Sequence, residues 1–246
     1  MNYQRAVILG ATSDMAYAFC KELGTNKINL TLLGRNQEKL EKIKNDLFIR
    51  YHIDVQAIPF DIEKDSIETV ISQLPRDFQI FACFVGYLGD QQKAQSDPKE
   101  AERIIRVNYT LPSLFTERIV ELLKAQNSSE KVIIGVSSVA GDRGRQSNYF
   151  YGSAKAGYTA YLSGLRNRLF KENIHVMTVK PGFVRTAMTA HLTLPKLLTA
   201  EPEEVAKDIY HSMVKKKNVL YTKWFWKYIM LIIRHIPEGI FKKLSL

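Results

Sequence analysis

Short apolar runs and longer amphipathic segments alternate along this chain. The apolar runs are four to seven residues long, which is typical of strands buried inside a sheet. Between them, segments such as residues 37–51 place Leu40, Ile43 and Leu47 on one side and charged residues on the other. This alternation predicts an α/β fold, a doubly wound parallel sheet of about seven strands with helices on both faces. The expected strands cover residues 6–10, 29–33, 55–60, 79–85, 131–136, 175–179 and 218–221, and the expected helices cover residues 14–23, 37–51, 101–125 and 151–170.

The whole chain fits one domain with an extension at its C-terminal end. Its 246 residues, 46% of them hydrophobic, are enough for one α/β core, and we find no repeat, low-complexity stretch or linker. We expect the domain to span residues 1–221 and the extension residues 222–246. Cys20 and Cys83 lie in apolar surroundings, so we expect reduced core cysteines, no disulfide and no metal site. The first apolar run, residues 6–9, is too short for a secretory signal, which predicts a cytoplasmic protein.

The C-terminal segment is both basic and apolar. Residues 215–246 hold eight Lys and Arg side chains against one Glu, which is +7 of the chain's net charge of +10. The apolar run at 224–233 is too short to span a bilayer, which takes about 20 residues. Such a segment suits either a peripheral site on the anionic inner face of the cell membrane or a helix packed on the body or on a second subunit. Both interpretations remain open, whereas the apolar run and the absence of a recognition module exclude nucleic acid as a partner.

A serine, a tyrosine and a lysine are the candidate catalytic groups. Ser138 follows an apolar run and would lie at a strand end, while Tyr151 and Lys155 are four residues apart and would share one helix face. A phenol has a pKa near 10, and a lysine cation about 4 Å away would lower the pKa of Tyr151 toward 7. Tyr151 would then give a proton to an alkoxide as hydride arrives, while Ser138 donates a hydrogen bond to the substrate oxygen.

A glycine-led turn after the first expected strand predicts a dinucleotide site. Gly10 is followed by a short loop and a helix, whose free N–H groups and dipole attract a phosphate. At the end of the second expected strand the chain has Arg35 and no acid. An arginine there can pair with a 2′-phosphate, which favours NADP(H), with NAD(H) as the alternative.

These motifs, in this order, resemble the short-chain dehydrogenase/reductase family from about residue 5 to residue 221. The resemblance implies a Rossmann-type fold and an NAD(P)-dependent oxidoreductase that acts on a ketone or an alcohol. In that family Asn108 would hold a water in a proton relay, and Lys155 would also bind the nicotinamide ribose. The family commonly forms dimers or tetramers through the helices around Asn108 and Tyr151, so we expect a homodimer or homotetramer. The matching positions are Gly10, Asp61, Gly86, Asn108, Ser138, Tyr151, Lys155, Pro181, Gly182 and Thr186.

The cofactor-binding turn departs from the family's Gly-x-x-x-Gly-x-Gly pattern. Asp14 and Ala16 replace the second and third glycines. Ala16 is small enough for close packing, whereas the Asp14 carboxylate would repel a pyrophosphate unless it or Ser13 caps the helix. By resemblance, Asp61 and its neighbour contact the adenine end, and Val184 and Thr186 hold the nicotinamide amide. The implied cofactor set is Gly10, Thr12, Ser13, Asp14, Met15, Arg35, Asp61, Ile62, Gly86, Tyr151, Lys155, Pro181, Gly182, Val184 and Thr186.

Five further motifs are similar to one branch of the family, the reductase half of the decaprenylphosphoryl-ribose 2′-epimerase. That branch reduces a 2-keto pentose carried on a polyprenyl phosphate, after a flavin enzyme has oxidised the 2′-hydroxyl. It implies a lipid-linked sugar substrate and a flavin oxidase partner. Arg143, Arg145 and Arg185 would either meet the substrate phosphate or lie in solvent. The motifs are residues 89–91, 107–110, 149–157, 184–192 and 234–244.

The sequence therefore predicts an NAD(P)H-dependent ketoreductase. Tyr151 would be the acid, Lys155 would adjust its pKa, Ser138 would polarise the carbonyl, and the loop over residues 184–199 would close over the substrate. Two alternatives remain. One is a short-chain reductase for a different ketone or alcohol, on a lipid or an isoprenoid. The other is a non-catalytic dinucleotide-binding protein associated with a membrane.

Overall fold

The structure, a computed structural model, describes residues 3–127, 130–190 and 193–244. Within these ranges, seven parallel strands form one sheet in the order β3-β2-β1-β4-β5-β6-β9, which confirms the predicted fold class. The order turns back between β1 and β4, and in such sheets ligands bind outside the carboxyl ends of the strands at that point. The strands are β1 (Arg5–Leu9), β2 (Asn29–Gly34), β3 (Val55–Pro59), β4 (Ile80–Cys83), β5 (Lys131–Val136), β6 (Ile174–Pro181) and β9 (Val219–Thr222), with a separate pair, β7 (Phe183–Val184) and β8 (Thr199–Ala200).

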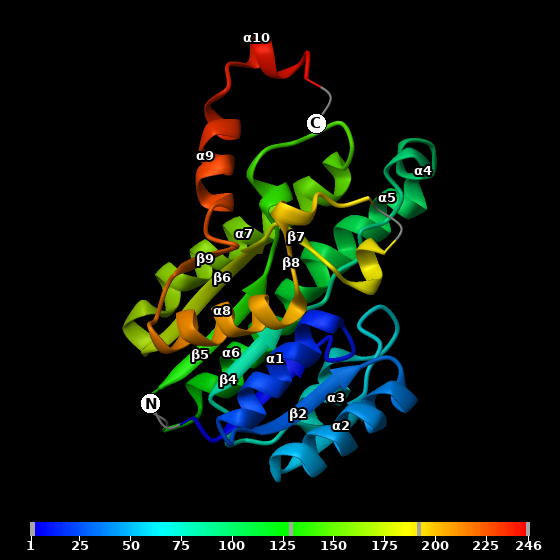
Figure 1. Cartoon of the computed structure of the whole chain (residues 1–246). Helices are drawn as coiled ribbons and strands as arrows, with labels where there is room; N and C mark the ends of the chain where they lie inside the picture. Colours follow the sequence, from blue (N-terminus) through cyan, green and yellow to red (C-terminus); the bar gives the residue numbers. More distant parts are fainter. Residues whose placement is uncertain (1–2, 128–129, 191–192, 245–246) are drawn as a thin grey trace.

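Helices cover both faces of the sheet (Figure 1). The apolar sides of α1, α2 and α8 pack into one core cluster, and those of α3, α6 and α7 pack into a second cluster on the opposite face. Since the strands are buried between two helical layers, their sequences are almost continuously apolar. The helices are α1 (Asp14–Thr25), α2 (Gln37–Tyr51), α3 (Ile67–Gln73), α4 (Gln91–Ser96), α5 (Pro98–Ile105), α6 (Leu111–Lys124), α7 (Tyr149–Leu169), α8 (Pro202–Val214), α9 (Trp226–His235) and α10 (Glu238–Phe241).

The structure corrects the helix assignments in two ways. The helix expected over residues 101–125 is interrupted by η1 (Arg106–Thr110), a π-helical segment between α5 and α6. Three helices, α3, α4 and α8, and the two short strands β7 and β8 are absent from the sequence prediction. Of these, α8 carried a readable signal, because Pro202 stands at its first turn and Glu201 and Glu204 form a capping box.

The C-terminal extension begins as a helix packed on the body. After β9, Trp226 and Met230 of α9 are buried against Val139, with Phe183 and Leu198 alongside. The opposite side of α9 faces solvent, and α10 lies at the tip of a projection beyond it (Figure 1). No helix among the described residues is long and apolar enough to span a membrane.

Candidate active site

The corner between β5 and α7 brings the candidate catalytic groups together. Ser138 directly follows β5 and Ser137, and it caps a short 3-10 turn, η2 (Val139–Asp142). Two glycines let η2 lie directly on α7. A Cβ on Gly141 would be 2.7 Å from the backbone of Lys155, and a Cβ on Gly152 would be 2.9 Å from a carbonyl oxygen of η2. The strand end that carries Ser138 is therefore fixed beside the turn of α7 that carries Tyr151 and Lys155.

Among Ser138, Tyr151 and Lys155, the lysine is the most buried. Only 2% of its surface is exposed, and its Nζ donates a hydrogen bond to the carbonyl oxygen of Val136 at 3.1 Å. The same nitrogen lies 5.8 Å from the centroid of the Tyr151 ring. Lys155 and Tyr151 therefore share one helix face, as their spacing predicts.

The electrostatics of this corner differ from the expectation. Burial raises the pKa of Tyr151 to about 12, and a hydrogen bond with Ser138 opposes this increase. Burial also lowers the pKa of Lys155 to about 8, and the Cys83 side chain partly offsets that decrease. The expected lowering of the Tyr151 pKa toward 7 is wrong for the protein's own groups, because desolvation of the phenol outweighs any effect of the ammonium. Tyr151 is consequently protonated at neutral pH.

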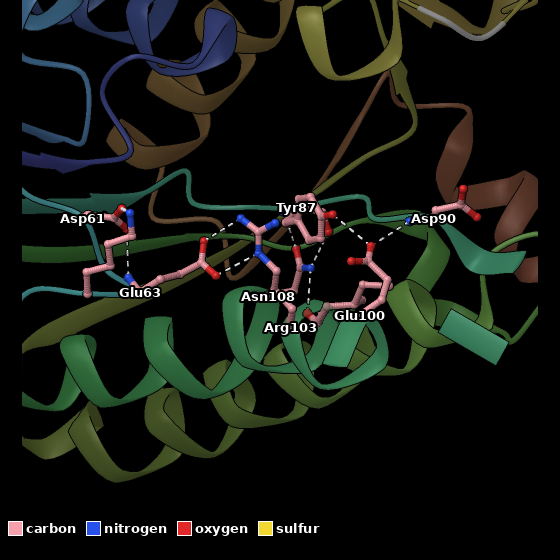
Figure 2. Close-up of polar contacts among 9 residues, drawn as sticks. Asp61, Glu63, Tyr87, Asp90, Glu100, Arg103 and Asn108 are labelled. Atoms are coloured by element: carbon pink, nitrogen blue, oxygen red, sulfur yellow. Dashed lines mark hydrogen bonds and ion pairs between the residues drawn. The ribbon is translucent and has the colours of Figure 1, made fainter. Parts of the chain in front are cut away.

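Asn108 lies in the π-helical segment η1 and is fully buried. Its Nδ2 donates to the carbonyl oxygen of Ile104 at 2.9 Å, and a side-chain bond of this kind opens a helix locally. The same Nδ2 also donates to the carbonyl oxygen of Tyr87 at 2.6 Å, and the Asn108 Oδ1 accepts from the backbone nitrogen of Tyr87 at 3.1 Å (Figure 2). A Cβ on Gly86 would be 3.4 Å from Asn108 Oδ1 and 3.6 Å from Lys155 Nζ. The end of β4, η1 and α7 thus meet at Gly86.

A chain of polar side-chain contacts extends from Tyr87, the partner of Asn108, to Glu63 (Figure 2). The Tyr87 hydroxyl donates to Glu100 Oε1 at 2.9 Å, and the guanidinium of Arg103 lies 4.3 Å from the centroid of the Tyr87 ring. Arg103 also binds both oxygens of Glu63 at 2.9 Å. These hydrogen bonds hold the pKa of Glu63 below its usual value. The chain of contacts connects the loop after β3 with the Asn108 segment.

A cavity of about 400 Å³ lies over the carboxyl ends of β1, β2 and β4. Its floor depends on Gly10, whose φ of +80° suits glycine and whose Cβ would be 3.0 Å from the backbone nitrogen of Val85. The cavity extends from Arg35 at one end to Gly86 at the other, and Gly86 adjoins Lys155. Seven of the predicted cofactor residues line it: Gly10, Thr12, Ser13, Arg35, Asp61, Ile62 and Gly86.

The other predicted cofactor residues are not among those that line this cavity. Met15 packs against the core, and Val184 is 4% exposed in the same core cluster. A Cβ on Gly182 would be 2.0 Å from Nε1 of Trp226, so this glycine serves the packing of α9. Thr186 caps a 3-10 turn, η4 (Ala187–Thr189). Pro181 ends β6, and Asp14 binds the backbone nitrogen of Ala187.

The three arginines proposed for a substrate phosphate have different surroundings. Arg143 binds the carbonyl oxygens of Ile233 and Ile236 and the carboxylate of Glu238, so it holds the C-terminal extension. Arg185 pairs with Glu201 at 2.8 Å on the surface. Arg145 lies against Val139 and Met230, and its buried Nε has no hydrogen-bond partner among the described residues. The motif that contained Arg185 ended at His191 and Leu192, which lie outside the described residues.

Sequence reasoning missed several residues at this site. The Ser137 hydroxyl donates to the carbonyl oxygen of Lys155 at 2.9 Å and shares a second hydrogen bond of 2.7 Å with the hydroxyl of Thr159. These two bonds fix the end of β5 to α7. Asn36 and Lys39 line the Arg35 end of the cavity, and Met188 lines the Gly86 end. The adjacent Ser137-Ser138 pair was a local signal. Lys39 and Met188 approach the cavity through tertiary structure.

The fold agrees with the comparison to known families. The family model for short chain dehydrogenase matches residues 4–196. The chain belongs to the short-chain dehydrogenase family. A relative from Mycobacterium tuberculosis (strain H37Rv), named as an uncharacterized oxidoreductase, is 34% identical over 243 residues, 97% of this chain and 96% of the relative. This short-chain dehydrogenase is therefore an NAD(P)-dependent oxidoreductase, as the sequence predicts.

Two solved structures share the fold of this short-chain dehydrogenase. A short-chain dehydrogenase from Sphingobium yanoikuyae in complex with NADPH has a TM-score of 0.83 at 19% identity, covering 96% of this chain and 97% of its own. An actinorhodin polyketide ketoreductase with NADPH has a TM-score of 0.79 at 17% identity, covering 91% of this chain and 97% of its own. At these identities the likeness concerns the fold.

Proposed function

We propose that this protein is an NADPH-dependent reductase of a ketone, with Tyr151 as the proton donor. The observation that carries the proposal is that Lys155 and Asn108 lie beside Gly86, at one end of the cavity. Tyr151 shares the helix face of Lys155 and forms a hydrogen bond with Ser138. A nicotinamide bound at that end would supply the hydride. Ser138 would donate a hydrogen bond to the carbonyl oxygen, and Tyr151 would protonate that oxygen as it becomes an alkoxide.

The proposed role of Tyr151 as an acid agrees with its protonation state. Its pKa of about 12 keeps the phenol protonated at neutral pH. A protonated phenol is ready to act as an acid toward an alkoxide, which is a stronger base than phenolate. It is poorly prepared to act as a base toward an alcohol. The Lys155 cation, largely retained at neutral pH with a pKa of about 8, would stabilise the phenolate that remains.

The preference for NADPH rests on charge at the far end of the cavity. Arg35 and Lys39 both line it there, next to Gly34 at the end of β2. Two cations at this point suit a ribose 2′-phosphate, whereas a preference for NAD would call for an acid. The Sphingobium yanoikuyae enzyme and the polyketide ketoreductase, which share the fold, are both in complex with NADPH. NAD(H) remains the alternative.

We propose a 2-keto pentose on a polyprenyl phosphate as the substrate class, supplied by a flavin-dependent oxidase. Support comes from the motif resemblance and from Arg145, whose buried, unpartnered Nε lies beside η2 and Ser138. A phosphate would provide the acceptor that this nitrogen lacks. The second candidate is a ketone on another lipid or isoprenoid.

A lipid-linked substrate agrees with the outer side of the C-terminal extension. Trp224, Tyr228 and Ile232 are each more than half exposed, and Lys223, Lys227 and Arg234 flank them. Aromatic and aliphatic side chains ringed by cations suit the boundary of an anionic membrane. We therefore propose peripheral membrane association through residues 222–244. We also propose a homodimer or homotetramer through the helices around Asn108 and Tyr151, α5 to α7, where Ile105, Tyr109, Leu114 and Tyr149 are exposed.

The first experiment removes the proton donor. Tyr151→Phe should abolish ketone-dependent oxidation of NADPH while NADPH still binds, as measured by fluorescence titration. Tyr149→Phe is the matched control, because this tyrosine lies two residues earlier on α7 and is 40% exposed. Unchanged turnover in Tyr151→Phe would refute the mechanism. Binding of NADPH without hydride transfer to any ketone would favour the non-catalytic alternative.

The second experiment separates the substrates and tests the membrane surface. A polyprenylphosphoryl 2-keto pentose is assayed beside the same keto sugar without lipid and beside simple ketones. Replacing Trp224 and Ile232 together with Ser should abolish sedimentation with phosphatidylglycerol vesicles. The matched control replaces Phe48 and Ile49 of α2, which are 59% and 69% exposed. Equal sedimentation of both double variants would refute the membrane proposal.

A further inference from the structure

Asp14 has no role in the function proposed so far, although it occupies the cofactor turn. It does not cap α1, since Ser13 Oγ accepts the hydrogen bond from the backbone nitrogen of Ala16 at 3.3 Å. Instead, the Asp14 carboxylate binds the segment that follows β7. Its Oδ2 accepts a hydrogen bond from the backbone nitrogen of Ala187 at 2.7 Å. This bond joins two segments that are 173 residues apart in the sequence.

The segment that Asp14 binds is a compact turn, residues 186–189. Thr186 and Thr189 cap it, and Thr189 Oγ1 also donates to the carbonyl oxygen of Val184 at 2.7 Å. Ala187 and Met188 line the cofactor cavity. The Met188 methyl group lies 3.7 Å from the position of a Cβ on Gly86, which is also close to Lys155 Nζ. The turn therefore forms the wall of the cavity at its catalytic end.

We propose that Asp14 is a positioning residue that holds the 186–189 turn over the cofactor cavity. This inference rests on the proposed binding of NADPH in that cavity. Release of the nicotinamide then requires the Asp14–Ala187 hydrogen bond to open. The residue that replaces a glycine in the phosphate-binding turn thus controls the opposite, catalytic end of the cavity.

The Asp14 carboxylate also has a second effect, which lowers the affinity for NADPH. Asp14 is the first residue of α1, where the helix N-terminus attracts a diphosphate, and its negative charge opposes that attraction. Its charge weakens NADPH binding, whereas its hydrogen bond slows NADPH release. Two kinds of substitution separate these effects, because the hydrogen-bond donor, the backbone nitrogen of Ala187, can be removed while the Asp14 charge stays.

Ala187→Pro removes the donor and leaves the Asp14 charge. Ala187 is the first residue of the 3-10 turn, a position that proline tolerates, and Thr186 has φ −138° and ψ 166°, the extended backbone favoured before proline. Asp14→Asn removes the charge and keeps an acceptor oxygen of the same size. Asp14→Ala removes both. Glu38→Ala is the control, because Glu38 is also an acid in the first turn of a helix at the cavity edge.

The main readout is the rate of NADPH dissociation, followed by fluorescence in a stopped-flow instrument. Ala187→Pro should raise this rate about fivefold, the effect of one solvent-accessible hydrogen bond. Asp14→Asn should tighten NADPH binding without raising the dissociation rate. Ala187→Pro should have no further effect in the Asp14→Ala background, because the bond is already lost there. A proline effect that persists in that background, or none in the wild type, would overturn the proposal.

Trypsin cleavage after Lys196 provides a readout that needs no cofactor. Lys196 is exposed and precedes Leu197, which is 87% exposed. Ala187→Pro and Asp14→Ala should both speed this cleavage about fivefold, and Asp14→Asn and Glu38→Ala should not. If NADPH fails to bind the wild type, the proposed function fails while this arm still tests the hydrogen bond. Equal cleavage of all variants, with unchanged melting temperatures, would overturn the positioning role.

Discussion

Replacing Lys155 with methionine should reveal the free energy that the fold spends on a buried ammonium group. Burial lowers the pKa of Lys155 from 10.5 to about 8. That difference of roughly 2.5 units corresponds to about 3 kcal/mol. The side chain is 2% exposed, so little of this penalty is screened by solvent. Methionine fills a similar volume without the charge, although it leaves the carbonyl oxygen of Val136 without its lysine donor.

The pH dependence of the free energy of unfolding separates the effect of the Lys155 charge from the effect of the lost hydrogen bond. Between the folded pKa of about 8 and the unfolded value of 10.5, the unfolded chain binds more protons at Lys155 than the native protein. The Lys155 contribution therefore makes the wild type more stable as the pH rises through this window. The penalty is about 3 kcal/mol at about pH 7 and falls to about 1 kcal/mol at about pH 9.5.

Urea denaturation of both proteins at these two pH values measures the effect. The free energy of unfolding of Lys155→Met, relative to wild type, should fall by about 2 kcal/mol from the lower to the higher pH. The lost hydrogen bond to Val136 affects both values alike and cancels, as do the titrations of buried groups that do not interact with Lys155. Lys171→Met, at an exposed site after α7, controls for the loss of one positive charge. A stability difference that is the same at both pH values would refute the reasoning.

Four further outcomes test other parts of the structure. Gly182→Ala should lower the free energy of unfolding by about 1–3 kcal/mol, because its Cβ would be 2.0 Å from Trp226; urea denaturation checks this. Gly86→Ala should fold normally, since its nearest contact is 3.4 Å, but raise the KM for NADPH. Arg143→Gln should speed tryptic cleavage after Arg234, because three bonds to the extension are lost. Ketone reduction should decline as pH rises through about 8, where Lys155 loses its charge, a result that initial rates with saturating cofactor would check.

The fold was largely predictable because each buried strand is a local apolar run. The catalytic corner was also predictable, since Ser138 follows one such run and Tyr151 and Lys155 share a helix face by spacing alone. The interruption at η1 was not, because it depends on the Asn108 side chain bonding to Ile104, and an asparagine in a helix does not reveal where its amide points.

Contacts between distant segments are the part of the structure that the sequence did not predict. Gly182 was expected near the cofactor, but its lack of a side chain makes room for Trp226, 44 residues later. Arg143 was expected either to meet a substrate phosphate or to lie in solvent, and the structure shows it bound to main-chain oxygens of the C-terminal extension. Both residues are close to the active site along the chain, and both face α9. Neither the small size of glycine nor the charge of arginine identifies its partner in advance.

The error over Tyr151 is instructive for the chemistry. A lysine cation at about 4 Å was expected to lower the pKa of the Tyr151 phenol toward 7. In the fold, the Lys155 nitrogen is committed to the carbonyl oxygen of Val136 and lies 5.8 Å from the ring centroid, and the phenol is desolvated. Desolvation penalises both phenolate and ammonium, so it raises the pKa of Tyr151 to about 12 and lowers that of Lys155 to about 8. At neutral pH both groups then carry their protons. A site in that state is prepared to protonate an alkoxide, in agreement with the proposed role of Tyr151 as the acid.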